Sequence, residues 1–180
     1  VFRSDLRLLG SVGQIIPFHF TTLENPKLLS IIENADICIN LKTTWDSKEL
    51  YLEKSIYTFN KELIEIIKKS ATIKKFIFFS GLGTEKRSTL RNVIISKTEE
   101  LVTKELKNSI IIRPSVILGN GDQFLSSLLP IFKMSFFIPL FGDGSKKFQP
   151  VLIEDIVDFV SNLIELPSLD ERLFELGGPD

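Results

Sequence analysis

The fold is decided by the stretch Ser109-Ile110-Ile111-Ile112-Arg113-Pro114-Ser115-Val116-Ile117-Leu118-Gly119-Asn120-Gly121-Asp122. Its first four residues leave no polar face, which is typical of a strand buried on both sides of a parallel sheet. Proline cannot donate to a strand ladder, so Pro114 predicts that the chain leaves the sheet here, at its carboxyl edge. Because ligands of open α/β sheets bind at that edge, we expect Pro114 and Ser115 to face a bound ligand.

Short apolar runs alternate with segments of helical period on both sides of this strand. Further strands are predicted at 14–18, 36–41, 75–80, 147–151 and 173–176, and helices at 25–34, 59–70, 96–107, 123–134 and 154–166. Parallel strands need crossover connections, and the helices in these connections cover both faces of the sheet. The pattern therefore predicts an α/β fold with a doubly wound parallel sheet.

Composition excludes several classes of function. A net charge of -1 over 180 residues provides no field that would favour nucleic acid or an anionic membrane surface. No apolar run approaches the roughly 20 residues that a membrane span needs. Cys38 and His19 are the only residues of their kinds, so neither a disulfide within the chain nor a zinc site of several Cys and His ligands is possible. We expect Cys38 to be a buried small hydrophobe and His19 to be structural.

Several motifs, in order along the chain, resemble the extended and atypical short-chain dehydrogenase/reductase superfamily. They are Val-Gly-Gln-Ile-Ile-Pro at 12–17, Ala-Asp-Ile-Cys-Ile-Asn-Leu at 35–41, Ile-Lys-Lys-Phe-Ile at 73–77 with Ser-Gly-Leu-Gly at 80–83, Ser-Lys at 96–97, Arg-Pro-Ser-Val at 113–116 with Gly119, Phe-Gln-Pro-Val at 148–151 with Asp155, and Glu-Leu-Gly-Gly-Pro at 175–179. Within the superfamily, the chain is most similar to the NAD(P)H-binding accessory subunit of respiratory complex I and its bacterial relatives. The resemblance implies a Rossmann-like sheet that binds NADP or NAD.

One part of the superfamily pattern is missing. The glycine-rich GxxGxxG turn, whose backbone amides hold the pyrophosphate, does not occur in this sequence. Val1-Phe2-Arg3 resembles the end of the second strand, so we expect a fragment that lacks the first βα unit. Residues 1–122 would form a partial NAD(P)-binding Rossmann domain, and residues 123–180 a small C-terminal lobe packed on it. Because the absent strand is central in the order 3-2-1-4-5-6, residues 1–180 alone are expected to fold poorly.

The catalytic set implied by the resemblance is also incomplete. A tyrosine is expected four residues before Lys97, where the chain has Val93, and a substrate-orienting hydroxyl about two residues after Ser80, where it has Leu82. Neither valine nor leucine can transfer a proton. We therefore predict no catalytic residue.

The same resemblance assigns contacts with the cofactor. Lys97, expected at the start of a helix, would hold a ribose, although a solvated helix lysine is the alternative. Ser80 would lie near the nicotinamide ribose or cap a strand. An arginine after the second strand can accept the 2′-phosphate of NADP. The predicted cofactor-binding residues are Lys97, Ser80, Pro114, Ser115, Asn40, Leu41 and Arg3, of which Asn40 and Leu41 act through their backbone, and no metal ligand is predicted.

Three functions are considered, of which the first is our leading hypothesis and the other two are its alternatives. The first is a non-catalytic structural or sensing subunit that binds a dinucleotide and associates with complex I subunits, in the mitochondrial matrix or at the cytoplasmic face of the bacterial inner membrane. The second is a reductase, epimerase or dehydratase of quinone or sugar metabolism, for which Tyr57 is a candidate proton donor and otherwise a packed aromatic. The third is a redox-sensing regulator. The aromatic segment 132–141 is either a partner surface or part of a self-packed lobe.

Overall fold

A four-stranded parallel sheet forms the centre of the molecule. The structure is a computed structural model and describes residues 6, 9–44, 48–134 and 147–179. The strands are β1 (Ile37–Asn40), β2 (Lys75–Phe79), β3 (Ser109–Pro114) and β6 (Leu173–Leu176), in the order β1-β2-β3-β6. Ile39 lies opposite Ile77, and Ile112 lies opposite both Phe79 and Phe174. All four carboxyl ends therefore meet at one edge of the sheet.

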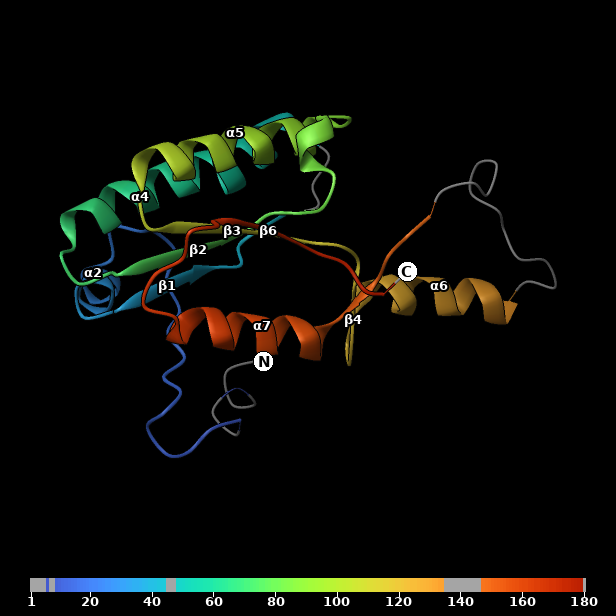
Figure 1. The fold of residues 1–180 in the computed structure, drawn as a ribbon, viewed down its shortest axis with the longest axis horizontal. Coiled ribbons are helices and arrows are strands. Elements are labelled where there is room, and N and C mark those ends of the chain that lie inside the picture. Colours follow the sequence, from blue (N-terminus) through green and yellow to red (C-terminus); the bar gives the residue numbers. More distant parts are fainter. Residues whose placement is uncertain (1–5, 7–8, 45–47, 135–146, 180) are drawn as a thin grey trace.

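Helices cover both faces of this sheet. Helices α4 (Phe59–Lys69) and α5 (Leu90–Glu105) lie on one face, and α7 (Ile153–Glu165) lies on the other (Figure 1). The predicted doubly wound, Rossmann-like parallel sheet is thus confirmed.

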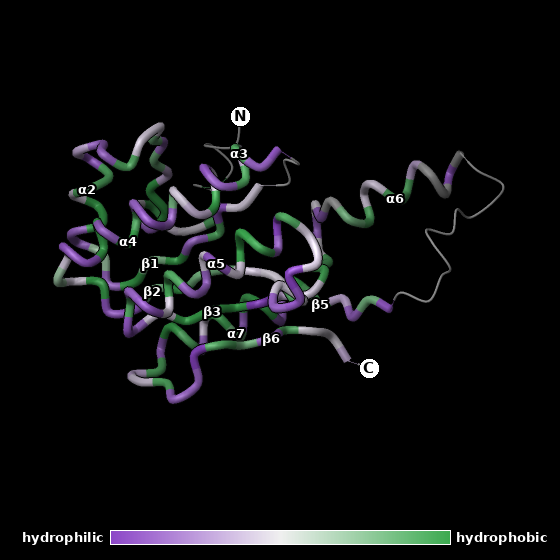
Figure 2. The backbone as a smooth tube through the Cα atoms, turned by 90° about the horizontal axis from the view of Figure 1, so that it is seen from above, coloured by the Kyte–Doolittle hydropathy of each residue, from purple (hydrophilic) through white to green (hydrophobic). Residues whose placement is uncertain are grey.

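Side-chain alternation along the central strands divides the core into two layers. Phe76 and Phe78 of β2 belong to the same core cluster as buried residues of α4 and α5, whereas Ile77 packs with Leu163 of α7. Successive residues of a strand point to opposite faces, so one apolar strand supplies both layers. The middle residues of the central strands β2 and β3 are accordingly hydrophobic (Figure 2).

The shorter elements connect these layers. They are α2 (Pro26–Glu33), α3 (Glu49–Leu52), the π-helix η1 (Glu53–Thr58), the 3-10 helix η2 (Thr84–Lys86), β4 (Ile117–Leu118), α6 (Gln123–Met134) and β5 (Val151–Leu152). Asn25 starts α2 because its side chain accepts hydrogen bonds from the amides of Lys27 and Leu28. Helices α3, η1 and α4 follow one another without a break, and α6 projects from the body of the molecule (Figure 2).

Two of the sequence motifs meet at the end of β6. The Gln149 side chain donates to the carbonyl oxygen of Gly178 at 2.7 Å, and the Gly178 amide donates to the carbonyl oxygen of Gln149 at 3.5 Å. A Cβ on Gly178 would lie 2.0 Å from the carbonyl oxygen of Pro150, so only glycine allows this approach. Although β6 follows residue 122, it belongs to the central sheet, and the proposed boundary at 122 stays a prediction.

Three predicted elements differ from the structure. The strand predicted at 14–18 is not formed, because a strand needs a neighbour for its amides and carbonyls and β1 pairs only with β2 among the described residues. The strand predicted at 147–151 shares only Val151 with β5, which also includes Leu152. Helix α5 begins at Leu90, six residues before the predicted start, because Thr89 caps it by accepting from the Asn92 amide at 3.1 Å.

Across the described residues, no helix combines the length and the apolar character that crossing a membrane requires. Cys38 is partly buried in β1, and burial raises the pKa of its thiol to about 11. The predicted site residue Arg3 lies outside the described residues.

Candidate functional site

The carboxyl edge of the sheet brings together five of the seven predicted cofactor-binding residues. They are Asn40 and Pro114, the last residues of β1 and β3, and the residues Leu41, Ser80 and Ser115, which directly follow β1, β2 and β3. Their proximity follows from the parallel register, in which Asn40 lies opposite Phe78 and Phe79 lies opposite Ile112. Backbone hydrogen bonds extend the pairing beyond the strands, with the Ser80 amide donating to Ile112 at 2.8 Å and the Ser115 amide donating to Leu176 at 2.8 Å.

A buried pair of asparagines fixes the first residue of this edge. The Asn40 side-chain amide donates to Oδ1 of Asn60 at 2.7 Å, and its own Oδ1 accepts from the Lys42 amide at 2.9 Å. Asn60, which is fully buried on α4, donates in turn to the carbonyl oxygen of Ile56 at 2.7 Å. The sequence analysis missed Asn60, although its spacing from Leu63 and Ile67 places it on the apolar stripe of the helix.

A second contact holds Thr43 and Thr44, which follow β1 by three and four residues. Arg91, in the first turn of α5, donates from Nε to the carbonyl oxygen of Thr44 at 3.1 Å and from Nη2 to Oγ1 of Thr43 at 2.8 Å. Burial lowers the pKa of Arg91. Lys42 lies over the Phe59 ring, 3.6 Å from its centroid, and burial also lowers the pKa of Lys42, against an opposing effect of Glu62.

A buried ionic network lies behind Ser80. The guanidinium of Arg113 makes a bidentate contact with the carboxylate of Glu99, at 3.0 and 2.7 Å, and Nη1 of Arg113 also reaches Glu175 at 3.0 Å and Glu85 at 3.3 Å. The Ser80 hydroxyl donates to Glu99. The hydrogen bonds that Arg113 donates to Glu99 raise the pKa of Arg113 above its usual range. Ser80 is therefore held by an internal carboxylate.

Lys97 lies on a different side of α5. Its Nζ is 3.1 Å from Oε1 of Glu53 and 4.1 Å from the centroid of the Tyr57 ring, both on η1. The hydrogen bond to Glu53 raises the pKa of Lys97. Lys97 and Glu99 are two residues apart, which places them on nearly opposite sides of a helix with 3.6 residues per turn. The structure therefore brings Glu99, and not Lys97, to Ser80.

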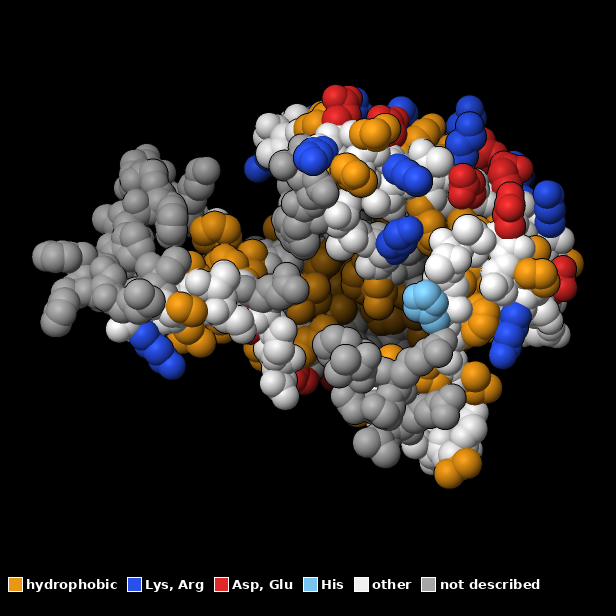
Figure 3. All heavy atoms as spheres, turned by 180° about the vertical axis from the view of Figure 1, so that it is seen from behind, with side chains coloured by type: hydrophobic (Ala, Val, Ile, Leu, Met, Phe, Trp, Pro, Cys, Tyr) orange, Lys and Arg blue, Asp and Glu red, His pale blue; other side chains and the backbone are white. Residues whose placement is uncertain are grey.

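Apolar side chains are exposed around this edge. Leu82 and Val93, which occupy the expected catalytic positions, are 42% and 40% exposed, and Leu41 is 65% exposed. Ile39 of β1 is also exposed. The view from the side of β1 has a hollow with hydrophobic side chains on its floor (Figure 3). Such a surface can contact rings and sugars, and none of these four side chains can donate a proton.

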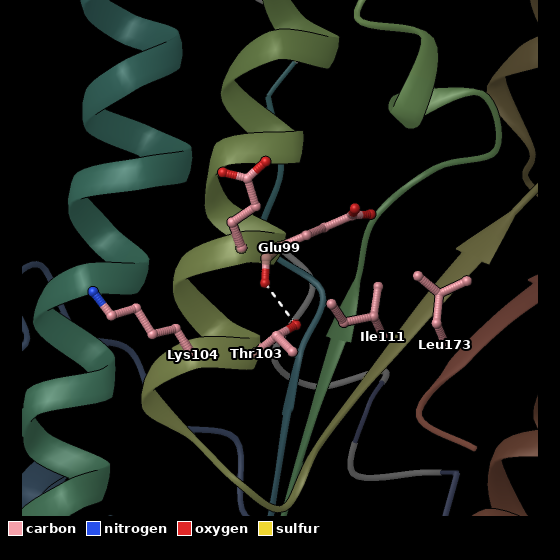
Figure 4. A pocket seen from close by; sticks show the side chains of 6 residues that line it. Glu99, Thr103, Lys104, Ile111 and Leu173 are labelled. Carbon is pink, nitrogen blue, oxygen red and sulfur yellow. Dashed lines mark hydrogen bonds between the residues drawn. The ribbon is translucent and has the colours of Figure 1, made fainter.

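A second hollow, of about 370 Å³, lies between α5, β3 and β6 (Figure 4). Ile111 and Leu173 supply its apolar side, and Thr103, which donates to the carbonyl oxygen of Glu99 at 2.8 Å, supplies part of the rim. None of the predicted site residues lines it. Within the described ranges, no group of three or more His, Cys, Asp or Glu side chains could hold a metal ion.

Comparison with known proteins identifies relatives along the whole chain. No family model matches the chain. It is 29% identical over 178 residues to the NADH dehydrogenase [ubiquinone] 1 alpha subcomplex subunit 9, mitochondrial, of Arabidopsis thaliana. The matched region covers 97% of this chain and 44% of that protein. The subunits with the same name from Dictyostelium discoideum and Rattus norvegicus are 25% and 24% identical, over 98% and 97% of this chain and 49% and 47% of those proteins. The chain therefore spans about half the length of the curated relatives it matches.

Solved structures with the same fold include an epimerase and a dehydratase of nucleotide sugars. The UDP-glucuronic acid 4-epimerase from Bacillus cereus, in complex with NAD, superimposes with a TM-score of 0.77 and 16% identity over 99% of this chain and 63% of that one. The dTDP-glucose 4,6-dehydratase from Bacillus anthracis, also with NAD, gives a TM-score of 0.71 and 15% identity over 94% of this chain and 61% of that one. At these identities the likeness shows a shared Rossmann-type fold.

Proposed function

We propose that this protein is a non-catalytic subunit that binds a nicotinamide dinucleotide and associates with respiratory complex I as a structural or sensing component. The observation that carries the proposal is the similarity, over 97% of the chain, to subunits whose name assigns them to the ubiquinone-dependent NADH dehydrogenase. By analogy with the mitochondrial relatives, the matrix or the cytoplasmic face of a bacterial inner membrane is the proposed location.

The carboxyl edge of the sheet fits the nicotinamide and ribose half of such a ligand. Asn40 and Leu41 would border it through their backbone on one side, and Ser80, Pro114 and Ser115 on the other. The exposed apolar side chains at this edge suit a ring and a sugar. The sequence contains no GxxGxxG turn for the pyrophosphate. The proposed contacts therefore concern only the nicotinamide and its ribose.

The side chains at this edge support binding without turnover. A bound nicotinamide dinucleotide would supply hydride transfer, and an enzyme would need to add a proton donor near it. The Ser80 hydroxyl donates a hydrogen bond to Glu99, and the positions expected to carry catalytic groups hold Val93 and Leu82. Lys97 would reach a ribose only by leaving Glu53.

The enzymatic alternative depends on Tyr57. The amino group of Lys97 lies over the face of the Tyr57 ring, so the two residues are in contact. A lysine over the ring face stabilises packing through a cation–π contact. We therefore favour a packing role for Tyr57, which agrees with its contact with the hydrophobic core.

The proposal is tested by purifying the complete protein natively, denaturing it and identifying the released nucleotide by mass spectrometry. About one NADP(H) or NAD(H) per chain is expected, and the identity of the nucleotide decides between the two cofactors. Protein that is purified without nucleotide and binds neither cofactor would refute the binding proposal.

Turnover and partners need separate measurements. We expect no consumption of cofactor with quinones or nucleotide sugars. Tyr57→Phe should leave the rate of isotope exchange unchanged. Steady turnover that Lys97→Ala abolishes would overturn the non-catalytic role. Native purification is expected to recover respiratory subunits, whereas recovery of a transcription factor would favour the redox-sensing regulator.

A further inference from the structure

The loop from Leu41 to Thr44 is fixed at both of its ends. At its start, Asn40 is held by Asn60 and by the Lys42 amide, in a site that is almost completely buried. At its end, the guanidinium of Arg91 holds Thr43 and Thr44. Few residues lie between the two anchors, so the loop has little freedom while both are intact.

Arg91 itself extends from a rigid position. Thr89 caps the first turn of α5, and the Asn92 side chain donates to the carbonyl oxygen of Gly83 at 3.4 Å. The Arg91 side chain is partly buried, and it contacts Thr44 and Thr43, which precede it by 47 and 48 residues in the sequence. It therefore connects the loop after β1 to the start of α5, across the edge where the dinucleotide is proposed to bind.

We propose that Arg91 is a positioning residue for the dinucleotide, which holds the loop after β1 in the conformation that the ligand contacts. The inference rests on the proposed function, because it assumes that Asn40 and Leu41 offer backbone groups to the ligand. A loop that is ordered before binding does not lose conformational entropy when the ligand arrives. If one anchor is removed, the loop has to become ordered when the ligand binds. The entropy cost of this ordering weakens the affinity for the dinucleotide.

The effect should be confined to one half of the ligand. The loop borders the same edge as Ser80, which is proposed to lie near the nicotinamide ribose. AMP lacks this half, so its binding does not depend on the loop. A general loss of structure would instead weaken the dinucleotide and AMP together.

The test uses Arg91→Met in the complete protein, with Arg87→Met as the matched control. Arg87 donates to Ser96 at 3.0 Å and to Glu100, so its guanidinium contacts α5 and not the loop. Arg91→Met is expected to raise the Kd for NAD(P)H about tenfold, a change of about 1.4 kcal/mol, and to leave the Kd for AMP unchanged. Arg87→Met is expected to leave both constants unchanged.

Hydrogen exchange gives a second measurement that needs no ligand. Amides of residues 42–44 are expected to exchange faster in ligand-free Arg91→Met and at the wild-type rate in Arg87→Met. Arg91→Lys keeps a donor for Thr44 and should restore part of the affinity. If Arg91→Met does not fold, Thr43→Val removes one acceptor of the same contact and should shift both measurements in the same direction by a smaller amount.

Each outcome decides the inference. Wild-type affinity and unchanged exchange in Arg91→Met would overturn it, and so would an equal loss for NAD(P)H and AMP. If the wild-type protein binds neither dinucleotide, the proposed function fails and the ligand role of Arg91 fails with it. The two failures are therefore distinguished by the behaviour of the wild-type protein.

Discussion

Removing either member of the buried Arg113 and Glu99 pair is expected to destabilise the protein, but by unequal amounts. Glu99 is 5% exposed and Arg113 is 9% exposed. Without Glu99, the arginine keeps contacts with Glu85 and Glu175 at 3.3 and 3.0 Å. Without Arg113, the carboxylate of Glu99 keeps only the neutral hydroxyl of Ser80 among the partners described above. The loss of the arginine is therefore the more severe change.

The contacts of the pair predict the order in which Arg113→Met, Glu99→Leu and the double variant lower the free energy of unfolding. Leaving one member of a buried ion pair uncompensated costs about 3–5 kcal/mol. Arg113→Met is expected near the upper limit of about 5 kcal/mol, and Glu99→Leu near the lower limit of about 3 kcal/mol, because Glu85 and Glu175 still compensate the arginine. The double variant should lose less than Arg113→Met alone, since neither buried charge remains and the other two carboxylates are partly exposed.

Urea unfolding of the complete protein and the three variants measures these differences. Equal slopes of free energy against urea would show that the variants unfold over the same surface. The exposed pair of Lys74 and Asp36 provides a control, because Asp36→Asn should leave the midpoint unchanged. The reasoning is refuted if Glu99→Leu is the more damaging single change, or if the double variant loses as much as the two single variants together.

Two further predictions concern Gly178 and Cys38. Gly178→Ala should lower the free energy of unfolding by about 2 kcal/mol, because the new Cβ would lie 2.0 Å from the carbonyl oxygen of Pro150. Gly81→Ala should be tolerated, because the atom nearest to its new Cβ is 3.8 Å away. Equal urea midpoints for the two variants would contradict this prediction. Cys38 should react slowly with iodoacetamide at pH 8 and faster as the pH rises towards 11, because burial raises the pKa of its thiol to about 11 and only the thiolate reacts. Alkylation at pH 8 as fast in the folded protein as in urea would contradict the buried thiol.

Elements whose pattern is local were predicted from the sequence. The apolar run at 173–176 became β6 with the same limits, and the periodic segment at 123–134 became α6. The run at 14–18 has the same local character, yet it forms no strand. Strand formation depends on a neighbouring strand as well as on composition, and composition alone could not reveal whether that neighbour was in place.

The site was predicted in part for the same reason. Parallel strands bring their carboxyl ends together, so Asn40, Ser80 and Pro114 could be placed at one edge from their positions alone. The side chains that hold this edge, above all Asn60 and Glu99, lie within helices, where polar residues are usually solvated. Glu99 is buried while its identical neighbour Glu100 is exposed, and only the packing of α5 against β3 distinguishes them.

The way these polar groups are used bears on why a fold shared with epimerases and dehydratases can serve binding alone. At the strand ends, the Ser80 hydroxyl is taken by Glu99 and the Asn40 amide by Asn60. Backbone groups and apolar side chains such as Leu41 then remain to meet a ligand. Under the proposed function, such a surface would recognise the shape of a ligand, whereas catalysis of proton transfer would need a titratable group within hydrogen-bonding reach of that ligand. Function follows from the groups at a site and not from the fold that carries them.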